Sequence, residues 1–399
     1  MLPHDELPRT ALSDRAFRDQ AAAEYALSVL SQTDESPAGL LAAALSVSAH
    51  SAATVGESLT AWHRRTELRY GADIFDRAEW DLDSVEADGL VAQSLLTDYA
   101  FDGFAQEQDP LSTDPRTDVP AMQPSTAIGV SAGISGVRLP LQLVQEWPVL
   151  AAEVDVMVDL HATQRGAHMS RLQEAVVDAA QTPYSDAVSF GIDLAARAAR
   201  SQECASATVT ARIGQQPRIS SAVTRRASTL DVVSTVVVSH DGERVRHLLT
   251  MLSVQIMTAC PCTIMYSRLA SERSAGREYG PEMPPTFTHS QPGVLEIGVS
   301  TDGESVIDLS EILSAAQASA VLREAVLKRP DEHELVERAH RRPQFTEDVT
   351  RAAAAAVACR VPGDAIVSVR ASLAESIHPH RATSSICVLA ADLHAQGSS

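Results

Sequence analysis

The spacing of apolar positions along the chain changes near residue 117. Before this point, Ala and Leu recur with the period of an amphipathic helix among acidic and Ser-rich positions. The stretches with this spacing are 12–32, 38–69 and 83–105. A segment rich in Pro, Asp and Thr, residues 109–124, then predicts a linker. We therefore predict a helical N-terminal extension, residues 1–117.

From residue 125 onward, apolar runs typical of strands alternate with amphipathic stretches typical of helices. The order strand–strand–helix–helix–strand–strand occurs twice. The expected strands are 127–138, 153–160, 206–214, 231–239, 244–258, 293–299, 364–372 and 384–392. The expected helices are 170–181, 186–201, 309–326 and, in pieces, 331–358.

This repeated order predicts an α+β fold with two modules, residues 118–242 and 243–399. Each module is expected to be an antiparallel sheet with a helix pair on one face. Asp241-Gly242 lies at the junction and is a strong signal for a hairpin turn between two strands.

Composition narrows the classes of function. The formal net charge is −20, which disfavours a nucleic-acid partner because phosphate backbones require a basic surface. A phosphorylated small molecule needs only a few placed cations. The N-terminus lacks a basic-then-apolar signal, and Ser and His interrupt the longest apolar stretch, 38–55. We expect a cytoplasmic protein with no membrane contact.

Two of the five cysteines, Cys260 and Cys262, lie close together. In a large cytosolic chain, such a pair indicates a metal-binding or catalytic role more than a disulfide. Because they follow an expected strand, we predict that the two thiols face different ways. One would then be a metal ligand and the other would have a second role. The alternative is two buried cysteines beside a turn-forming proline.

Histidines and a carboxylate also lie next to two other expected strands: one group follows the strand 364–372, and one histidine precedes the strand 293–299. Glu375, His378 and His380 lie within six residues, and carboxylate with imidazole suits metal binding or proton transfer near neutral pH. A His-rich polar loop is the alternative. His289 stands alone before a strand, and a lone histidine is usually not a ligand.

Cations and acidic residues also occur at expected helix starts. Lys328, the only lysine, stands beside Arg329 in a segment that ends in Glu332, and its singularity suggests a point-charge role. Carboxylates at such positions, Glu332 included, are otherwise explained by capping. Arg165 and Arg171 flank another helix start and suit a phosphate, although an ordinary capped helix also explains them.

Taken in order, these motifs resemble the GTP cyclohydrolase IB family, which has a bacterial folate branch and an archaeal methanopterin branch. The resemblance covers about residues 118–393. The matching motifs are Gln164-Arg165-Gly166 with His168-Met169-Ser170-Arg171, Cys260-Pro261-Cys262, Thr288-His289-Ser290-Gln291, Lys328-Arg329-Pro330-Asp331-Glu332, Phe345-Thr346-Glu347-Asp348 and Glu375-Ser376-Ile377-His378-Pro379-His380.

The resemblance implies two tandem tunnelling-fold (T-fold) modules in a homodimer or homotetramer with active sites at subunit interfaces. It implies one divalent metal per site, Zn, Fe(II) or Mn(II), on Cys260, His289 and Glu332. The substrate would be GTP or a related purine nucleotide, attacked at C8 to release formate. The product would be a dihydroneopterin phosphate, cyclic or linear.

The resemblance also implies roles for other residues. Glu347 would bind the guanine edge, and Gln291 would also contact substrate. The residues around the reacting ring would be Cys260, Cys262, Glu375, His378 and His380, with His378, oriented by Glu375, as the proton shuttle. The triphosphate would lie on Arg165, Arg171, Lys328 and Arg329.

Two departures from the bacterial pattern keep alternatives open. Pro292 stands where that pattern has Arg, and residues 267–285 form a longer insertion that is expected to be a lid. A family paralogue could therefore act on another purine nucleotide or stop at a ring-opened product. A third alternative is a non-catalytic binding or scaffold protein.

Overall fold

The computed structural model describes the chain in several stretches. The described residues are 27, 45, 48, 59–70, 74–77, 118–124, 128–202, 204, 206–276, 287–303, 305–325 and 328–396. The chain forms two compact units, of which one comprises Met1–Val130 with His161–Arg165. The other comprises Ser131–Leu160 with Gly166–Ser399.

The first unit contains the short helices α3 (Leu59–Tyr70) and α4 (Ile74–Arg77) and the 3-10 turn η3 (Val119–Ala121). Trp62 is fully buried, and its indole nitrogen donates to the hydroxyl of Ser48 at 3.0 Å. The helix expected at 38–69 is confirmed at its C-terminal end, in α3. Apart from Leu27, the expected helices at 12–32 and 83–105 lie outside the described residues.

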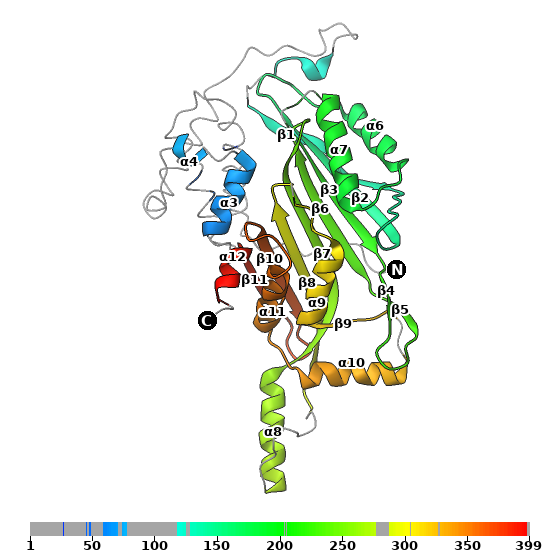
Figure 1. The fold of residues 1–399 in the computed structure, drawn as a ribbon, viewed down its shortest axis with the longest axis vertical. Helices are drawn as coiled ribbons and strands as arrows, with labels where there is room; N and C mark the ends of the chain where they lie inside the picture. The colour runs from blue at the N-terminus through cyan, green and yellow to red at the C-terminus, as the bar shows by residue number, and fades with distance from the viewer. Residues whose placement is uncertain are drawn as a thin grey trace. The chain divides into compact units, whose positions relative to one another are not determined.

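The second unit is built on one antiparallel sheet, in which nine strands are described. Their order is β1-β2-β3-β6-β7-β8-β10-β11, and the short β9 (Val321–Leu322) pairs with β7 (Figure 1). The strands are β1 (Val130–Leu139), β2 (Val149–Leu160), β3 (Ala207–Gln215), β6 (Val232–His240), β7 (Val245–Ala259), β8 (Ser290–Thr301), β10 (Ile366–Ala374) and β11 (Arg381–Leu389). A separate hairpin of β4 (Arg218–Ser220) and β5 (Ala227–Thr229) extends from the β3–β6 connection.

Strand formation follows from apolar alternation. In β2, Val154, Val156 and Val158 are fully buried, while the residues between them are only partly covered. The expected turn between β6 and β7 is confirmed. Its Gly242 has φ 93°. The Asp241 carboxylate accepts hydrogen bonds from the backbone amides of Glu243 and Arg244 at 2.9 and 2.8 Å.

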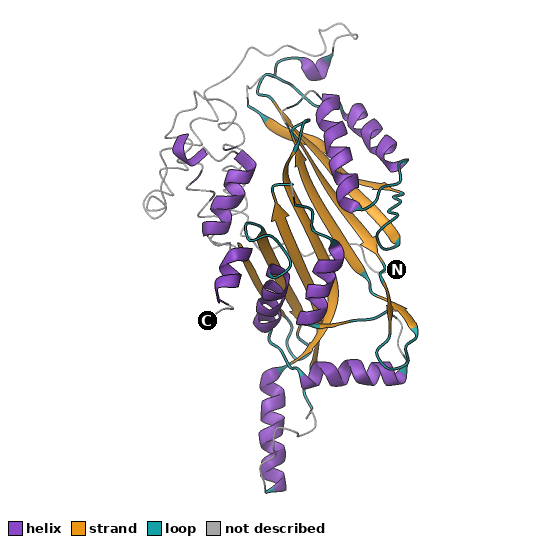
Figure 2. Ribbon diagram, viewed as in Figure 1, coloured by secondary structure: helices purple, strands orange, loops and turns teal. Residues whose placement is uncertain are grey.

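Two helix pairs cover one face of the sheet (Figure 2). α6 (Met169–Ala180) and α7 (Ala187–Gln202) form one core with β2, β3 and β6, around the buried Phe190. α9 (Leu309–Ser319) and α11 (Thr346–Ala358) form a second core with β7, β8 and β10, around Ile312. Val238 of β6 pairs with Leu248 of β7 and both belong to the first core, so the sheet is continuous across the two cores.

α8 (Pro261–Ala275) and α10 (Arg329–Arg341) lie outside these layers, whereas α12 (Ala390–Gln396) contributes the buried Ala390 to the second core. α8 projects from the end of the sheet, and α10 crosses that end (Figure 1). In α8, Ser267 is the one buried residue, and the large apolar Met265 and Tyr266 are exposed. No helix in the described stretches has the length and hydropathy needed to cross a membrane.

The α+β class and the repeated order of elements are confirmed. The helix expected at 309–326 ends at Ser319, because Val321 and Leu322 leave it to pair with Met257 and Ile256 of β7. α8 was not expected, since a helix with almost no buried side leaves no apolar stripe in the sequence. The lid expected at 267–285 begins as the second half of α8, and the rest of that segment lies outside the described residues.

Candidate functional site

Cys260 and His289 lie side by side at one end of the sheet. Cys260 follows the last residue of β7, and His289 precedes the first residue of β8. These two strands are paired to their ends, and the backbone amide of Cys260 donates to the carbonyl of His289 at 3.2 Å. The hydroxyl of Thr288 donates to the carbonyl of Cys260 at 2.9 Å and fixes the junction further.

Glu375 joins the pair from the third strand. It follows β10, which pairs with β8. The buried side chain of Gln291 in β8 donates from Nε2 to Oε1 of Glu375 at 2.5 Å. The other end of that amide, Oε1, accepts from the hydroxyl of Thr258 in β7 at 3.2 Å. Gln291 therefore holds the Glu375 carboxylate in register with the end of β7.

The His289 ring is buried without a hydrogen bond. Its side chain is 10% exposed, and neither ring nitrogen has a hydrogen-bond partner. Nδ1 lies 3.8 Å from Oε2 of Glu375, beyond hydrogen-bond distance. Leaving buried polar atoms unpaired costs free energy, so such a ring is expected to have a partner when the site is filled. A thiol and an imidazole from neighbouring strand ends are two donors of the kinds that bind a divalent metal, and a third donor is needed to complete such a site.

The third predicted ligand, Glu332, is not gathered with Cys260 and His289. It lies exposed in the first turn of α10. The residue of this helix that reaches the strand end is His340, whose Nε2 lies 3.5 Å from the carbonyl of Thr288. Eight residues of helix separate Glu332 from His340, roughly 12 Å along the axis. In the described stretches, no three His, Cys, Asp or Glu residues gather to hold a metal.

The reason given above for separating the two thiols is wrong. Residues two apart on an extended chain share a face, so a strand end alone would not part them. Cys260 is instead the N-cap of α8, with extended φ −68° and ψ 119°, and Pro261 begins the helix. Cys262 is exposed in the first helical turn, whereas Cys260 is half-buried and its Sγ accepts from the hydroxyl of Thr263 at 3.6 Å.

The two histidines of the β10–β11 loop lie apart from the buried site. His378 and His380 are exposed, and their rings stack with centroids 5.2 Å apart. Glu375 contacts Gln291 and His289, and no hydrogen bond joins it to His378 in the described residues. The neighbours of the Glu375 carboxylate are therefore Gln291 and His289, not His378. Glu347 lies exposed in the first turn of α11.

The four predicted phosphate cations do not form one group. Arg165 belongs to the first unit. Within the second unit, Arg171 of α6 donates to the carbonyl of Ser201, and Figure 1 shows α6 far from α10. Lys328 and Arg329 lie together and exposed at the start of α10.

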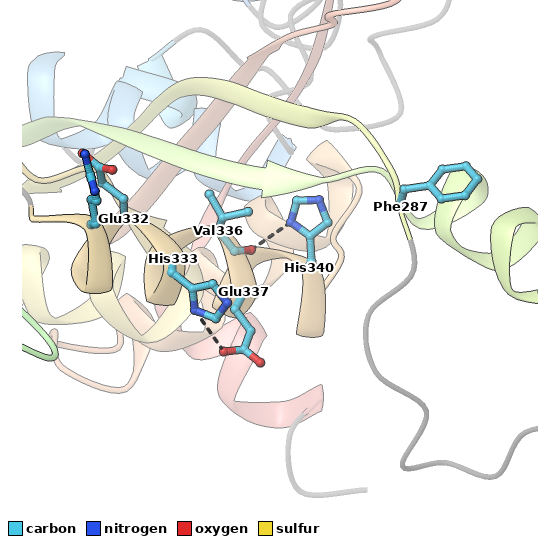
Figure 3. Close-up of a pocket in the computed structure, with 7 residues that line it drawn as sticks. Phe287, Glu332, His333, Val336, Glu337 and His340 are labelled. Carbon is cyan, nitrogen blue, oxygen red and sulfur yellow. Dashed lines mark hydrogen bonds and ion pairs between the residues drawn. The ribbon is translucent and has the colours of Figure 1, made fainter.

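A hollow of about 620 Å³ follows the outer face of α10. Figure 3 shows Glu332 and His340 at opposite ends of this face, with His333 and Glu337 between them. The residues that line it are Phe287, Arg329, Glu332, His333, Val336, Glu337 and His340. The hollow thus runs from the cations at the start of α10 to the strand end that carries His289.

Asp331 was given no role of its own in the sequence analysis, but its side chain is buried and joins two elements of the structure. Its carboxylate accepts hydrogen bonds from the backbone amides of Val223 and Thr224, both at 2.9 Å, and from the hydroxyl of Thr224 at 2.6 Å. Burial raises the pKa of Asp331, but these hydrogen bonds outweigh burial and leave the pKa well below its usual range. A local sequence pattern does not predict this contact, because Asp331 and the turn residues are more than a hundred positions apart.

Comparison with known proteins identifies the family of the chain. The family model of the type I GTP cyclohydrolase folE2 matches residues 117–384. The GTP cyclohydrolase MptA of Thermoplasma volcanium is 31% identical over 283 residues, which are 69% of this chain and 96% of that protein. The GTP cyclohydrolase MptA of Aeropyrum pernix is 33% identical over 259 residues, 62% of this chain and 87% of that protein.

Among solved structures, a uricase from Bacillus fastidious is similar with a TM-score of 0.39 and 9% identity. The match covers 68% of this chain and 96% of the uricase. This likeness is too weak to assign a fold family. The match of the family model to most of the chain, together with the archaeal relatives, decides the assignment. The chain belongs to the type I GTP cyclohydrolase folE2 family.

Proposed function

We propose that this protein is a metal-dependent GTP cyclohydrolase, which opens the imidazole ring of guanine at C8 and releases formate. The product is a dihydroneopterin phosphate, cyclic or linear. The observation that carries the proposal is the buried His289 ring, which lacks a hydrogen bond, lies 3.8 Å from Glu375 and belongs to the residue whose backbone is bonded to that of Cys260. The family membership supplies the purine nucleotide as the substrate class.

Cys260 and His289 would hold the metal, a divalent Zn, Fe(II) or Mn(II) ion. When bound, such an ion supplies Lewis acidity and a lowered pKa of water. Glu375 faces Nδ1 of His289 and favours the proton on that nitrogen, which leaves Nε2 free to act as a ligand. Gln291 fixes the carboxylate that does this. The third ligand, Glu332, is expected from a second copy of the chain, within a homodimer or homotetramer of tandem T-fold modules.

The remaining predicted residues keep their roles within this proposal. The exposed His378 and His380 would move protons at the reacting ring once a nucleotide is bound, and Cys262 would lie beside it. Glu347 would accept hydrogen bonds from the guanine edge. Lys328 and Arg329 would bind the triphosphate, because they open onto or flank the hollow along α10.

The test is incubation of the purified protein with GTP and Fe(II), Mn(II) or Zn(II) in turn, while formate and pterin fluorescence are measured. We expect both products to appear with at least one metal and to vanish with chelator. Formate without pterin fluorescence would replace the product by a ring-opened one. Neither signal with any metal would refute the assignment to GTP.

A second candidate is another purine nucleotide as substrate, which the departure at Pro292 favours. Pro292 is paired with Met257 inside the sheet and is the neighbour of Gln291. Successive strand residues point to opposite faces, so Pro292 does not face Glu375; the departure bears on a phosphate or base contact and not on the buried site. Parallel incubations with ATP, ITP and GTP distinguish the two candidates, since the second requires faster formate release from a nucleotide other than GTP.

A further inference from the structure

The tip of the β4–β5 hairpin is fastened to the start of α10. The turn residues Val223 and Thr224 donate three hydrogen bonds to the carboxylate of Asp331. The backbone amide of Lys328 donates to the same carboxylate at 3.3 Å. One carboxylate therefore joins the hairpin turn, residues 221–226, to the first turn of α10 (Figure 1).

This contact brings four cationic residues together. Arg225 and Arg226 come directly after Thr224, and Lys328 and Arg329 begin α10. All four are exposed, and the ion pairs of the described residues include none of them. The chain carries a net charge of −20, yet these four cationic positions lie at one contact between two elements.

The surroundings do not neutralise this group. Asp331 is 2% exposed and its charge is satisfied by hydrogen bonds, so it caps the helix and does not face the solvent. Glu324 is half-buried, and burial raises its pKa. Glu332 is exposed and is the predicted metal ligand. An anion from outside is therefore the partner that the cations lack.

The position of the group identifies the kind of anion. Arg329 and Glu332 are one helical turn apart and line the same hollow. The hollow continues along α10 to His340, which lies at the strand end beside His289. A ligand with an anionic tail at Arg329 would lie beside Glu332, the predicted metal ligand. Arginine binds phosphate oxygens with two parallel hydrogen bonds, which suits a chain of phosphates.

We propose that the turn 221–226 is a phosphate-binding element that, with Lys328 and Arg329, takes the polyphosphate tail of a nucleoside triphosphate. Asp331 is the positioning residue that holds the element in place. The identity of the nucleotide rests on the function proposed above. The phosphate element itself does not, because its chemistry requires only a polyphosphate.

The probe is inorganic tripolyphosphate, titrated into the full-length protein by calorimetry. The buffer contains magnesium, so that the probe does not remove another metal from the protein. Arg225→Ala and Arg226→Ala are each expected to weaken binding about tenfold or more, and the double variant further. The loss shrinks as salt is raised. The control is Arg244→Ala, an exposed arginine in the β6–β7 turn, which is expected to bind within about twofold of the parent.

Asp331→Asn tests the positioning role. It keeps all four cations but weakens the hold on the turn, so tripolyphosphate binding falls and KM for GTP rises while kcat changes little. A merely structural role would lower the amount of folded protein and kcat with KM unchanged. Thr224→Val, which removes only the hydroxyl donor, is expected to give a smaller rise in KM and provides the test if Asp331→Asn does not fold.

The results separate this proposal from the enzymatic one. Unchanged tripolyphosphate affinity in the double arginine variant overturns the phosphate element. An equal loss in Arg244→Ala also overturns it, because general charge would then explain the binding. Arginine-dependent tripolyphosphate binding without formate release from GTP keeps the element and refutes the assignment to GTP.

Discussion

The two halves of the sheet share one plan but differ in what is attached to it. The first half, residues 130–240, consists of β1 to β6 with α6 and α7, and the second, residues 245–396, consists of β7 to β11 with α8 to α12. Each half packs a helix pair on its strands around an apolar core. In the part of the chain that the structure describes, the second half alone carries additional helices at its strand ends, α8 after β7 and α10 between α9 and α11.

This difference locates the chemistry. Cys260, His289 and Glu375 lie at the edge of the sheet where β7 and β10 end and β8 begins, and Glu332, Arg329 and the hollow belong to α10. The first half contributes its hairpin turn, which reaches α10 through Asp331. A repeated scaffold thus carries an apolar core in both halves, whereas the candidate site and the hollow lie with segments added at one edge of the second half.

The largest expected effect is the loss of metal on substitution at the end of β7. Cys260→Ala removes a proposed ligand beside the buried His289, so we expect stoichiometric metal binding and formate release to be abolished. Cys262→Ala changes an exposed helix residue and is expected to retain the metal. Elemental analysis of the purified variants measures both. Equal loss of metal in the two would show that the thiols share one role.

A control for this pair comes from the surface. Cys359 is exposed at the C-terminal end of α11, away from the strand ends that hold His289. Cys359→Ala is therefore expected to bind metal like the parent. Loss of metal in this variant as well would mean that metal content follows protein damage and not the site.

The sequence predicted the repeated scaffold because its elements are local. Apolar alternation in β2 and the Asp241-Gly242 turn are contained within a few residues. The residues of the candidate site were named and grouped through a family resemblance, but the contacts of Glu375 with Gln291 and His289 were not predicted. Glu375 contacts Gln291 and His289 because three strand ends meet, and pairing of distant strands leaves no mark in a single sequence.

The contact of Asp331 with Thr224 is hidden for the same reason. Asp331 reads as an ordinary capping residue at a helix start, a role that it does fill. The hairpin that supplies its other donors comes from the other half of the sheet. Local capping and long-range fastening use the same carboxylate, and only the folded chain distinguishes them.

A core substitution in the first half tests whether the halves are as united as their shared sheet indicates. Phe190 is fully buried, so Phe190→Ala is expected to lower the free energy of unfolding by about 3–5 kcal/mol. Circular dichroism against urea measures it, and folded Phe190→Ala is expected to keep its metal. Val177→Ala on the exposed side of α6 is the control, with a change within about 0.5 kcal/mol. A second transition that retains the metal would show independent halves.

The smallest expected effect is a difference between the two halves in the rate at which their cysteine thiols are alkylated. Cys204 in the first half is partly buried, and its Sγ lies 3.2 Å from the carbonyl of Ser206. Burial, with the nearby charge of Asp159, raises the pKa of Cys204 to about 11. Its thiolate fraction at pH 8 is then roughly a hundredfold below that of an ordinary cysteine. Iodoacetamide followed by mass spectrometry should label the exposed Cys262 first and Cys204 last, with Cys204 accelerating as pH approaches 11. Equal rates at pH 8 would show that the first half opens to reagent as readily as the helix that carries the site.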